Sequence, residues 1–330
     1  MIQTRKVTSK LLARLWPAKT SAAAPAAPPP RVPHGGKDFA PYPEADGTWE
    51  PFDHAAINSA MREAGFATFP FLAPSRIDQL GKAIELAETS LDRSDVHIPT
   101  HFELSAFSND SDYKKRIYDN VWACLKDDIE AILPNYEPLV INVFDKPPSE
   151  AYDPVPIHQN PSFVDEPRYR SVSLWIPLSD VDRENGTVGV LPGSHGRFNR
   201  IRAGNMAHED IFAEVQAELE NELFVPVVMN KGEMLALDDS IIHWSYPNVS
   251  DRRRKAVQLI MVPRGVPHIY YYYDEESQDD PMMDLYVVDH RFFFGFNCKA
   301  RPETLKLIER VPYHYRPISR AELLANDEPS

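Results

Sequence analysis

The 330-residue sequence contains few cysteines and no long apolar run. Cys124 and Cys298 are its only cysteines, too few for a disulfide framework, so a reducing compartment is the simplest setting. No apolar stretch approaches the ~18 residues that a membrane-spanning helix needs. The apolar core of a secretory signal is also missing. These absences favour a soluble, cytoplasmic protein without a membrane partner.

An excess of positive charge is missing as well. The formal net charge is −14, which argues against nucleic acid as a partner because phosphate contacts need clustered Lys and Arg. The charge is uneven: residues 1–37 carry seven Lys or Arg and no acid, so residues 38–330 carry −21. This basic, Ala/Pro-rich segment predicts a disordered tail. It is either a dispensable extension or an organelle transit peptide, and both interpretations stay open.

The apolar pattern divides the remaining chain, residues 38–330, which we expect to form one domain. Residues 38–137 predict helices at 54–63, 73–91 (with Ser75 as N-cap) and 112–133, and a short strand at 66–71 that Pro70 interrupts. From residue 138 the pattern alternates. Strands are expected at 139–144, 155–159, 170–178, 187–191, 223–228, 234–236, 241–246 and 255–262, with an inserted helix at 209–220. The pattern predicts a mainly β fold with flanking helices, in which an antiparallel barrel or jelly roll is supported by the N-terminal helices.

Residues 266–330 form an extension rich in aromatic side chains. Four consecutive tyrosines end at Tyr273, and a Phe-rich segment follows at 291–296. We expect most of these side chains to pack on the outer surface of the barrel or against a partner chain. A homodimer through this region is an alternative, because aromatic residues are enriched at interfaces.

Two blocks of the sequence carry recognisable landmarks. The first block contains His158-Gln159-Asn160, Trp175-Ile-Pro-Leu, Asn185-Gly186 and Pro192-Gly193-Ser194-His195. The second contains Lys231-Gly232, His243-Trp-Ser245, Pro247-Asn248 and Arg252-Arg253-Arg254. In this order the landmarks resemble the phytanoyl-CoA dioxygenase family of iron(II)- and 2-oxoglutarate-dependent oxygenases. The resemblance is closest over residues 138–265.

This resemblance implies a double-stranded β-helix, a cupin-like jelly roll, that binds Fe²⁺, 2-oxoglutarate and O₂. It also implies hydroxylation, or another oxidation, of an unactivated C–H bond in a small-molecule, acyl or natural-product substrate. Such a centre needs three protein ligands on one face of an octahedron. His158, residue 160 and His243 correspond to them. Side chains two positions apart on a strand point the same way, so His158 and residue 160 can reach one ion.

The resemblance also assigns residues to 2-oxoglutarate. Arg254 lies eleven residues after His243, where the family places the arginine that binds the distal carboxylate through two charge-assisted hydrogen bonds. A shift of one residue would give this role to Arg253 instead. Ser245 would add a hydroxyl donor. Trp175 is expected either to wall this pocket or to pack in the core, and Asn142 to hydrogen-bond toward the cosubstrate.

The sequence departs from the family at one ligand. Asn160 stands where the family has Asp, so the site loses one negative charge. Three explanations remain open: Asn160 ligates iron in an active enzyme, the protein is a catalytically silent relative with a binding or structural role, or Asp165 or Glu166 moves in as the ligand. A cupin-type metabolite binder is a further alternative.

Overall fold

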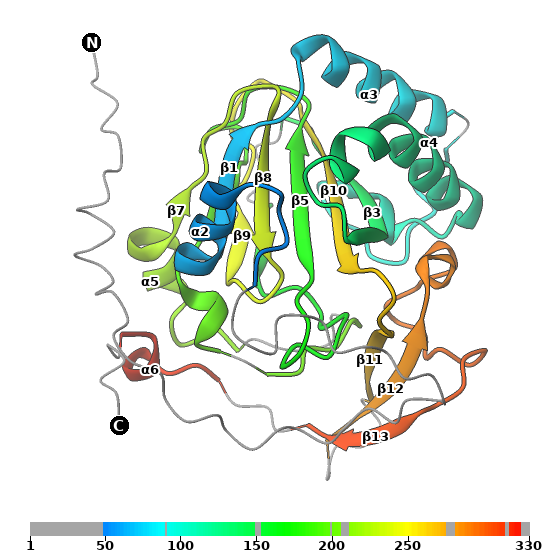
Figure 1. Cartoon of the computed structure of the whole chain (residues 1–330), viewed down its shortest axis with the longest axis vertical. Helices are drawn as coiled ribbons and strands as arrows, with labels where there is room; N and C mark the ends of the chain where they lie inside the picture. Colours follow the sequence, from blue (N-terminus) through cyan, green and yellow to red (C-terminus); the bar gives the residue numbers. More distant parts are fainter. Residues whose placement is uncertain are drawn as a thin grey trace.

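The computed structural model describes residues 49–89, 91–148, 153–198, 200–205, 211–274, 281–313 and 317–324. Three antiparallel sheets dominate it, with helices packed beside them (Figure 1). The expectation of a mainly β fold with flanking helices is confirmed. The predicted N-terminal tail lies outside the described residues.

The largest sheet has six strands in the order β1-β8-β5-β10-β3-β2. Along the sheet these are β1 (Phe66–Pro70), β8 (Glu233–Asp238), β5 (Val172–Pro177), β10 (Arg254–Pro263), β3 (Tyr136–Lys146) and β2 (Glu103–Leu104). Pro70 does not interrupt β1 but ends it, paired with Glu233. Proline is tolerated there because β1 is an edge strand.

A second sheet of four strands faces the inner side of the first. It has the order β4-β9-β6-β7, formed by β4 (Val155–His158), β9 (His243–Ser245), β6 (Val188–Val190) and β7 (Val225–Pro226). An apolar cluster joins the two sheets, with Trp175 and Leu235 from the first and Val188 and Val190 from the second. Two antiparallel sheets that enclose side chains between them make the expected jelly-roll barrel.

Three helices precede or interleave with the first strands: α2 (Ala55–Ala64), α3 (Pro74–Ala87) and α4 (Ser111–Glu130). The apolar faces of α3 and α4 join one core with the outward-facing side chains of the six-stranded sheet, including Ile141, Leu174 and Val257. Each strand of this sheet therefore gives alternate residues to the helices and to the barrel interior. The expected N-cap Ser75 was wrong: Ala73 is the N-cap and Pro74 the first helical residue, a position that proline suits.

The inserted helix expected at 209–220 was largely wrong. Residues 206–210 lie outside the described part, and the rest forms only α5 (Gln216–Glu218) and a π-helical turn, Leu219–Leu223. Ile211, Phe212, Val215 and Leu219 are nevertheless buried together with Trp244 of β9. Irregular turns bury these apolar residues as well as a helix would, so tertiary packing overrides the helical pattern.

The C-terminal extension forms a separate three-stranded sheet. It consists of β11 (His268–Asp274), β12 (Met282–Val288) and β13 (Glu309–Pro312), and the short helix α6 (Arg320–Leu324) follows. Tyr270, Tyr271 and Tyr286 are buried within the chain. None of the helices among the described residues has both the length and the apolarity to cross a membrane.

Candidate metal and cosubstrate site

The inner face of the six-stranded sheet carries polar side chains near its centre. Gln258 of β10 lies directly opposite Asn142 of β3 and Trp175 of β5, and Arg254 lies opposite Lys146. Directly paired residues point to the same side of a sheet. All five side chains therefore face the barrel interior, which the two sheets enclose.

The two histidines of the sequence motifs meet on the opposite sheet. His158 at the end of β4 pairs with His243 at the start of β9, and their ring centroids are 4.2 Å apart. The Nδ1 atoms lie 2.8 Å from the carbonyl oxygen of Pro156 and 3.0 Å from that of Ile241, respectively. A carbonyl can only accept, so each Nδ1 carries the proton and each Nε2 is left with a free lone pair.

Both imidazoles stay neutral near pH 7. Burial lowers the pKa of His158, and burial together with the neighbouring His158 lowers the pKa of His243 to about 3. Metals bind the neutral ring, so protons would compete little for these two nitrogens. Backbone carbonyls that fix the ring tautomer are typical partners of metal-binding histidines.

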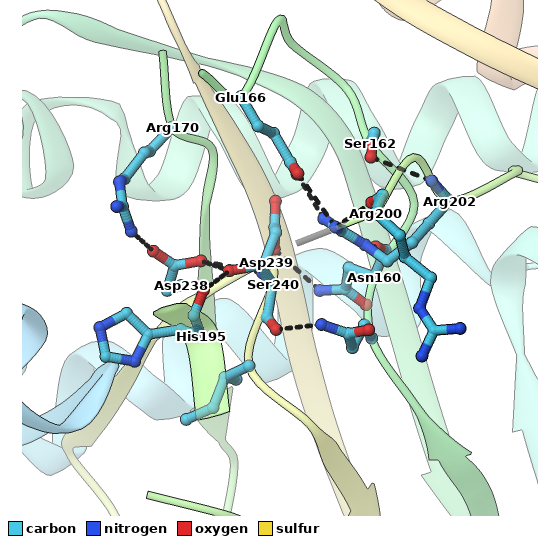
Figure 2. Close-up of polar contacts among 12 residues, drawn as sticks. Asn160, Ser162, Glu166, Arg170, His195, Arg200, Arg202, Asp238, Asp239 and Ser240 are labelled. Atoms are coloured by element: carbon cyan, nitrogen blue, oxygen red, sulfur yellow. Dashed lines mark hydrogen bonds and ion pairs between the residues drawn. The ribbon is translucent and has the colours of Figure 1, made fainter. Parts of the chain in front are cut away.

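Asn160 lies beside the imidazole pair, deeply buried. Its amide nitrogen donates to Asp239 Oδ1 at 2.8 Å (Figure 2). It also donates to Ser173 Oγ at 2.9 Å. The Asn160 side chain is also close enough to the His158 ring to oppose the fall in the pKa of that ring. The amide therefore faces His158 on one side and Asp239 on the other.

Asp238 and Asp239 lie shortly before β9 in the chain, but their side chains contact residues other than His243. Asp239 contacts Asn160, and Asp238 accepts from Arg170 at 2.9 Å and from the Ser240 backbone (Figure 2). Burial raises the pKa of Asp239 to about 6, although hydrogen bonds from Ser171, Ser173 and Asn160 oppose the rise. Near pH 7 the carboxylate form still predominates.

The carboxylates expected as replacement ligands are engaged elsewhere. Glu166 forms an ion pair with Arg202, whose Nε also donates to the Asn160 carbonyl oxygen (Figure 2). Asp165 lies 3.6 Å from Arg168. Among the described residues, no group of three His, Cys, Asp or Glu side chains is arranged to hold a metal ion.

Three consecutive arginines have different environments. Arg252 pairs with Asp182 and Arg253 with Asp145, and the side chains of both are about half exposed (48% and 54%). Arg254 is 1% exposed, and its guanidinium carbon lies 5.5 Å from the centroid of the Trp175 ring. Its Nε and Nη1 have no hydrogen-bond partner in the described part of the chain. Burial lowers its pKa to about 10, so it stays charged at pH 7.

Other candidate cosubstrate residues lie on strands of the same barrel. Ser245 of β9 is buried, and its hydroxyl lacks a hydrogen-bond partner among the described residues. Asn142 donates to Gln258 at 3.3 Å, and Gln258 donates to Ser173 at 3.4 Å. Trp175 both packs in the core and contacts Arg254. A buried cation and a buried hydroxyl without partners are costly unless an acceptor binds them.

The sequence did not identify Lys146 as part of this region. Lys146 is fully buried and donates to the carbonyl oxygens of Asp153 at 2.9 Å and Tyr246 at 2.8 Å. Burial, and then the charge of Arg254, lower its pKa to about 6. The strand period would have found it, because residues 142, 144 and 146 share one face of β3.

A cavity of about 270 Å³ lies outside the barrel interior. Its lining includes Ile98, Phe102 and Tyr113, with Val143 and Asp145 from β3. Val143 belongs to the core shared with the helices. The cavity is therefore on the outer side of β3, away from Asn142, and it is not the metal and cosubstrate site.

Comparison with known proteins identifies the family of the chain. A family model described as phytanoyl-CoA dioxygenase (PhyH) matches residues 61–256. The chain belongs to this family. Phytanoyl-CoA dioxygenase domain-containing protein 1 of Bos taurus is 36% identical over 105 residues, which is 30% of this chain and 36% of that protein. A phytanoyl-CoA dioxygenase of Arabidopsis thaliana is 33% identical over 107 residues, or 32% of this chain and 37% of that protein.

These matches thus span little more than a third of the length of the two relatives. Among solved structures, the non-heme alpha ketoglutarate dependent carbocyclase SnoK from nogalamycin biosynthesis aligns with a TM-score of 0.50 and 18% identity. That alignment covers 65% of this chain and 86% of SnoK, and it shows a shared fold.

Most of the candidate residues have the chemistry that binding of a metal ion and 2-oxoglutarate would need. Two neutral imidazoles with free Nε2 atoms suit a divalent metal, and the buried Arg254 suits a carboxylate. Asn160, the residue predicted as the third donor, is an amide and lacks the charge of a carboxylate.

Proposed function

We propose that the protein is an iron(II)- and 2-oxoglutarate-dependent oxygenase that hydroxylates, or otherwise oxidises, an unactivated C–H bond of a small molecule. One observation carries the proposal: the paired imidazoles of His158 and His243 and the buried guanidinium of Arg254 belong to the same barrel. Family membership supports it. Iron with 2-oxoglutarate and O₂ would supply the oxidising power.

The residues of the chain would hold these reactants. His158, His243 and the amide oxygen of Asn160 would ligate iron. Arg254 and Ser245 would bind the distal carboxylate of 2-oxoglutarate, with Trp175 as a wall of the pocket and Asn142 as a hydrogen-bond donor. Arg254 is 1% exposed, and shielding from water strengthens charge-assisted hydrogen bonds.

The second candidate is a catalytically silent family member with a binding or structural role. The neutral Asn160 favours it, because a neutral ligand attracts a dication less strongly than a carboxylate does. A homodimer through the C-terminal region and a cytoplasmic or organellar location also remain proposals.

Two measurements on the purified full chain separate the candidates. Anaerobic titration with Fe²⁺ and 2-oxoglutarate should produce the visible metal-to-cosubstrate charge-transfer absorption, and exposure to O₂ should then yield succinate. His243→Ala should abolish both signals. Metal binding without succinate formation, combined with succinate formation in Asn160→Asp, would establish the silent candidate.

A further inference from the structure

Asn160 is held in one orientation by its neighbours. Both hydrogens of its amide group are used, one toward Asp239 Oδ1 at 2.8 Å and one toward Ser173 Oγ at 2.9 Å. The Ser173 hydroxyl itself donates to Asp239 Oδ1 at 2.6 Å, so its oxygen is the acceptor for Asn160. The backbone N–H of Asn160 adds a bond to the Asp239 carbonyl oxygen at 2.9 Å.

The reversed amide is excluded on chemical grounds. A flip would place the Asn160 oxygen against the Asp239 carboxylate, and both groups can only accept hydrogen bonds. The amide oxygen therefore points away from Asp239, to the side on which His158 lies. Asp239 decides which atom of Asn160 faces the imidazole pair.

Asp239 also carries a buried charge that lacks a counter-charge. Its side chain is 1% exposed, and the donors that act on it, the hydroxyls of Ser171 and Ser173 and the amide of Asn160, are all neutral. No Lys or Arg within the described part of the chain forms an ion pair with it, whereas the adjacent Asp238 pairs with Arg170. A buried carboxylate without a cation is costly. A divalent ion held by the imidazoles and Asn160 would lie on the far side of the amide and offset that cost.

We infer that Asp239 is a positioning residue of the metal site, which orients the Asn160 oxygen toward the ion and provides the negative charge that this neutral ligand lacks. A carboxylate that accepts from an amide N–H draws electron density toward the amide oxygen and makes it a better donor to a cation. The Asn160–Asp239 pair thus carries the same net charge as a single aspartate ligand. The inference rests on the proposed function, since it requires a divalent ion at the two histidines.

The test is a set of Co²⁺ affinities measured by isothermal titration calorimetry on the full chain. Asp239→Asn should weaken binding about 10- to 100-fold, the usual effect of losing a partner of a metal ligand. Asn160→Ala should weaken it at least as much. Asp238→Asn, which removes the adjacent carboxylate without touching Asn160, should stay close to wild type. Thermal unfolding of each variant without metal verifies that it is folded.

The decisive variant exchanges the two groups. In the double variant Asn160→Asp with Asp239→Asn, the carboxylate becomes the ligand and the amide becomes its donor, so the hydrogen bond between the two residues is kept with its direction reversed and the net charge is conserved. Its Co²⁺ affinity should recover to the wild-type range, whereas a merely structural role of Asp239 predicts no recovery. Equal losses in Asp239→Asn and Asp238→Asn would overturn the inference.

A different pattern would show that Asp239 is itself a ligand. Co²⁺ binding would then survive Asn160→Ala and be lost in Asp239→Asn, which also contradicts the inference. Absence of Co²⁺ binding in the wild type would instead overturn the proposed function. The failures of the two proposals are therefore distinguishable.

Discussion

At the scale of single residues, strand direction separates three arginines that are consecutive in the sequence. Arg254 begins β10 and faces the barrel interior, whereas the half-exposed Arg252 and Arg253 pair with the exposed Asp182 and the buried Asp145, respectively. The sequence spacing selected Arg254 but allowed a shift of one residue. Burial distinguishes it from its neighbours, and its role in 2-oxoglutarate binding stays a prediction.

Substitution of the buried arginine should abolish most cosubstrate binding. Arg254→Met should weaken 2-oxoglutarate binding by about 2 kcal/mol or more, roughly 30-fold, because one partner of a buried charged pair is lost. Arg253→Met is the matched control and should bind like wild type. Calorimetric titration of the metal-loaded protein with 2-oxoglutarate measures both. If Arg253→Met weakened 2-oxoglutarate binding more than Arg254→Met, then Arg253, and not Arg254, would bind the carboxylate.

The buried Lys146 predicts a pH dependence of stability. Its folded pKa of about 6 lies far below the ordinary lysine value of 10.5. Between these values the unfolded chain holds the additional proton, so the free energy of unfolding should rise with pH, by at most about 1.4 kcal/mol per unit. Above pH 10.5 the buried lysine is neutral in both states and costs no stability through protonation. This cost grows as the pH falls from 10.5 toward 6.

Urea unfolding between pH 7 and 9 measures this effect. The wild-type rise should be reduced in Lys146→Met, which cannot take up the proton. Lys115→Met, on the exposed side of α4, should keep the wild-type pH dependence. Parallel curves for all three proteins would refute the assignment of the slope to Lys146.

At the scale of secondary structure, the apolar spacing predicted α4 and most of the barrel strands. Strand ends differ from prediction by one to three residues at most sites, as in β3 and β8. The register of the sheet could not be predicted, because it depends on turns and on contacts between distant segments. Register is what places Gln258 opposite Asn142 and Trp175.

The contact between α4 and the six-stranded sheet should be a major source of stability. Leu125 is fully buried in the core that these elements share. Leu125→Ala should lower the free energy of unfolding by about 2–5 kcal/mol, through lost apolar contact and a residual cavity. Leu86→Ala on α3, where the side chain is 68% exposed, should change it by less than about 0.5 kcal/mol. Urea titration at constant pH compares the two variants.

At the scale of the whole molecule, the C-terminal sheet is tied to the helices and the barrel. Tyr118 of α4 stacks on His290 with ring centroids 4.9 Å apart, and Lys114 donates to the Phe296 carbonyl oxygen at 2.6 Å. Ile269 of β11 donates to the Phe163 carbonyl oxygen at 2.8 Å. These contacts support the prediction that residues 38–330 form one domain.

A single domain should unfold in one cooperative transition. All five tryptophans precede residue 245, so tryptophan fluorescence does not report directly on the C-terminal sheet. Leu285→Ala, in the core of that sheet, should still lower the urea midpoint seen by tryptophan fluorescence. An unchanged fluorescence midpoint, with an earlier second transition by far-UV circular dichroism, would divide the chain into two domains.

The sequence by itself determined the mainly β fold, the family, and the candidate ligands His158, Asn160 and His243, because these depend on local periodicity and on ordered motifs. Only the tertiary structure decided that Asp239 contacts Asn160, that Glu166 is engaged by Arg202, and that Lys146 lies buried opposite Arg254. Residues 160 and 239 are 79 positions apart. Their contact follows from how the strands are paired across two sheets, and no local pattern of the chain encodes that pairing.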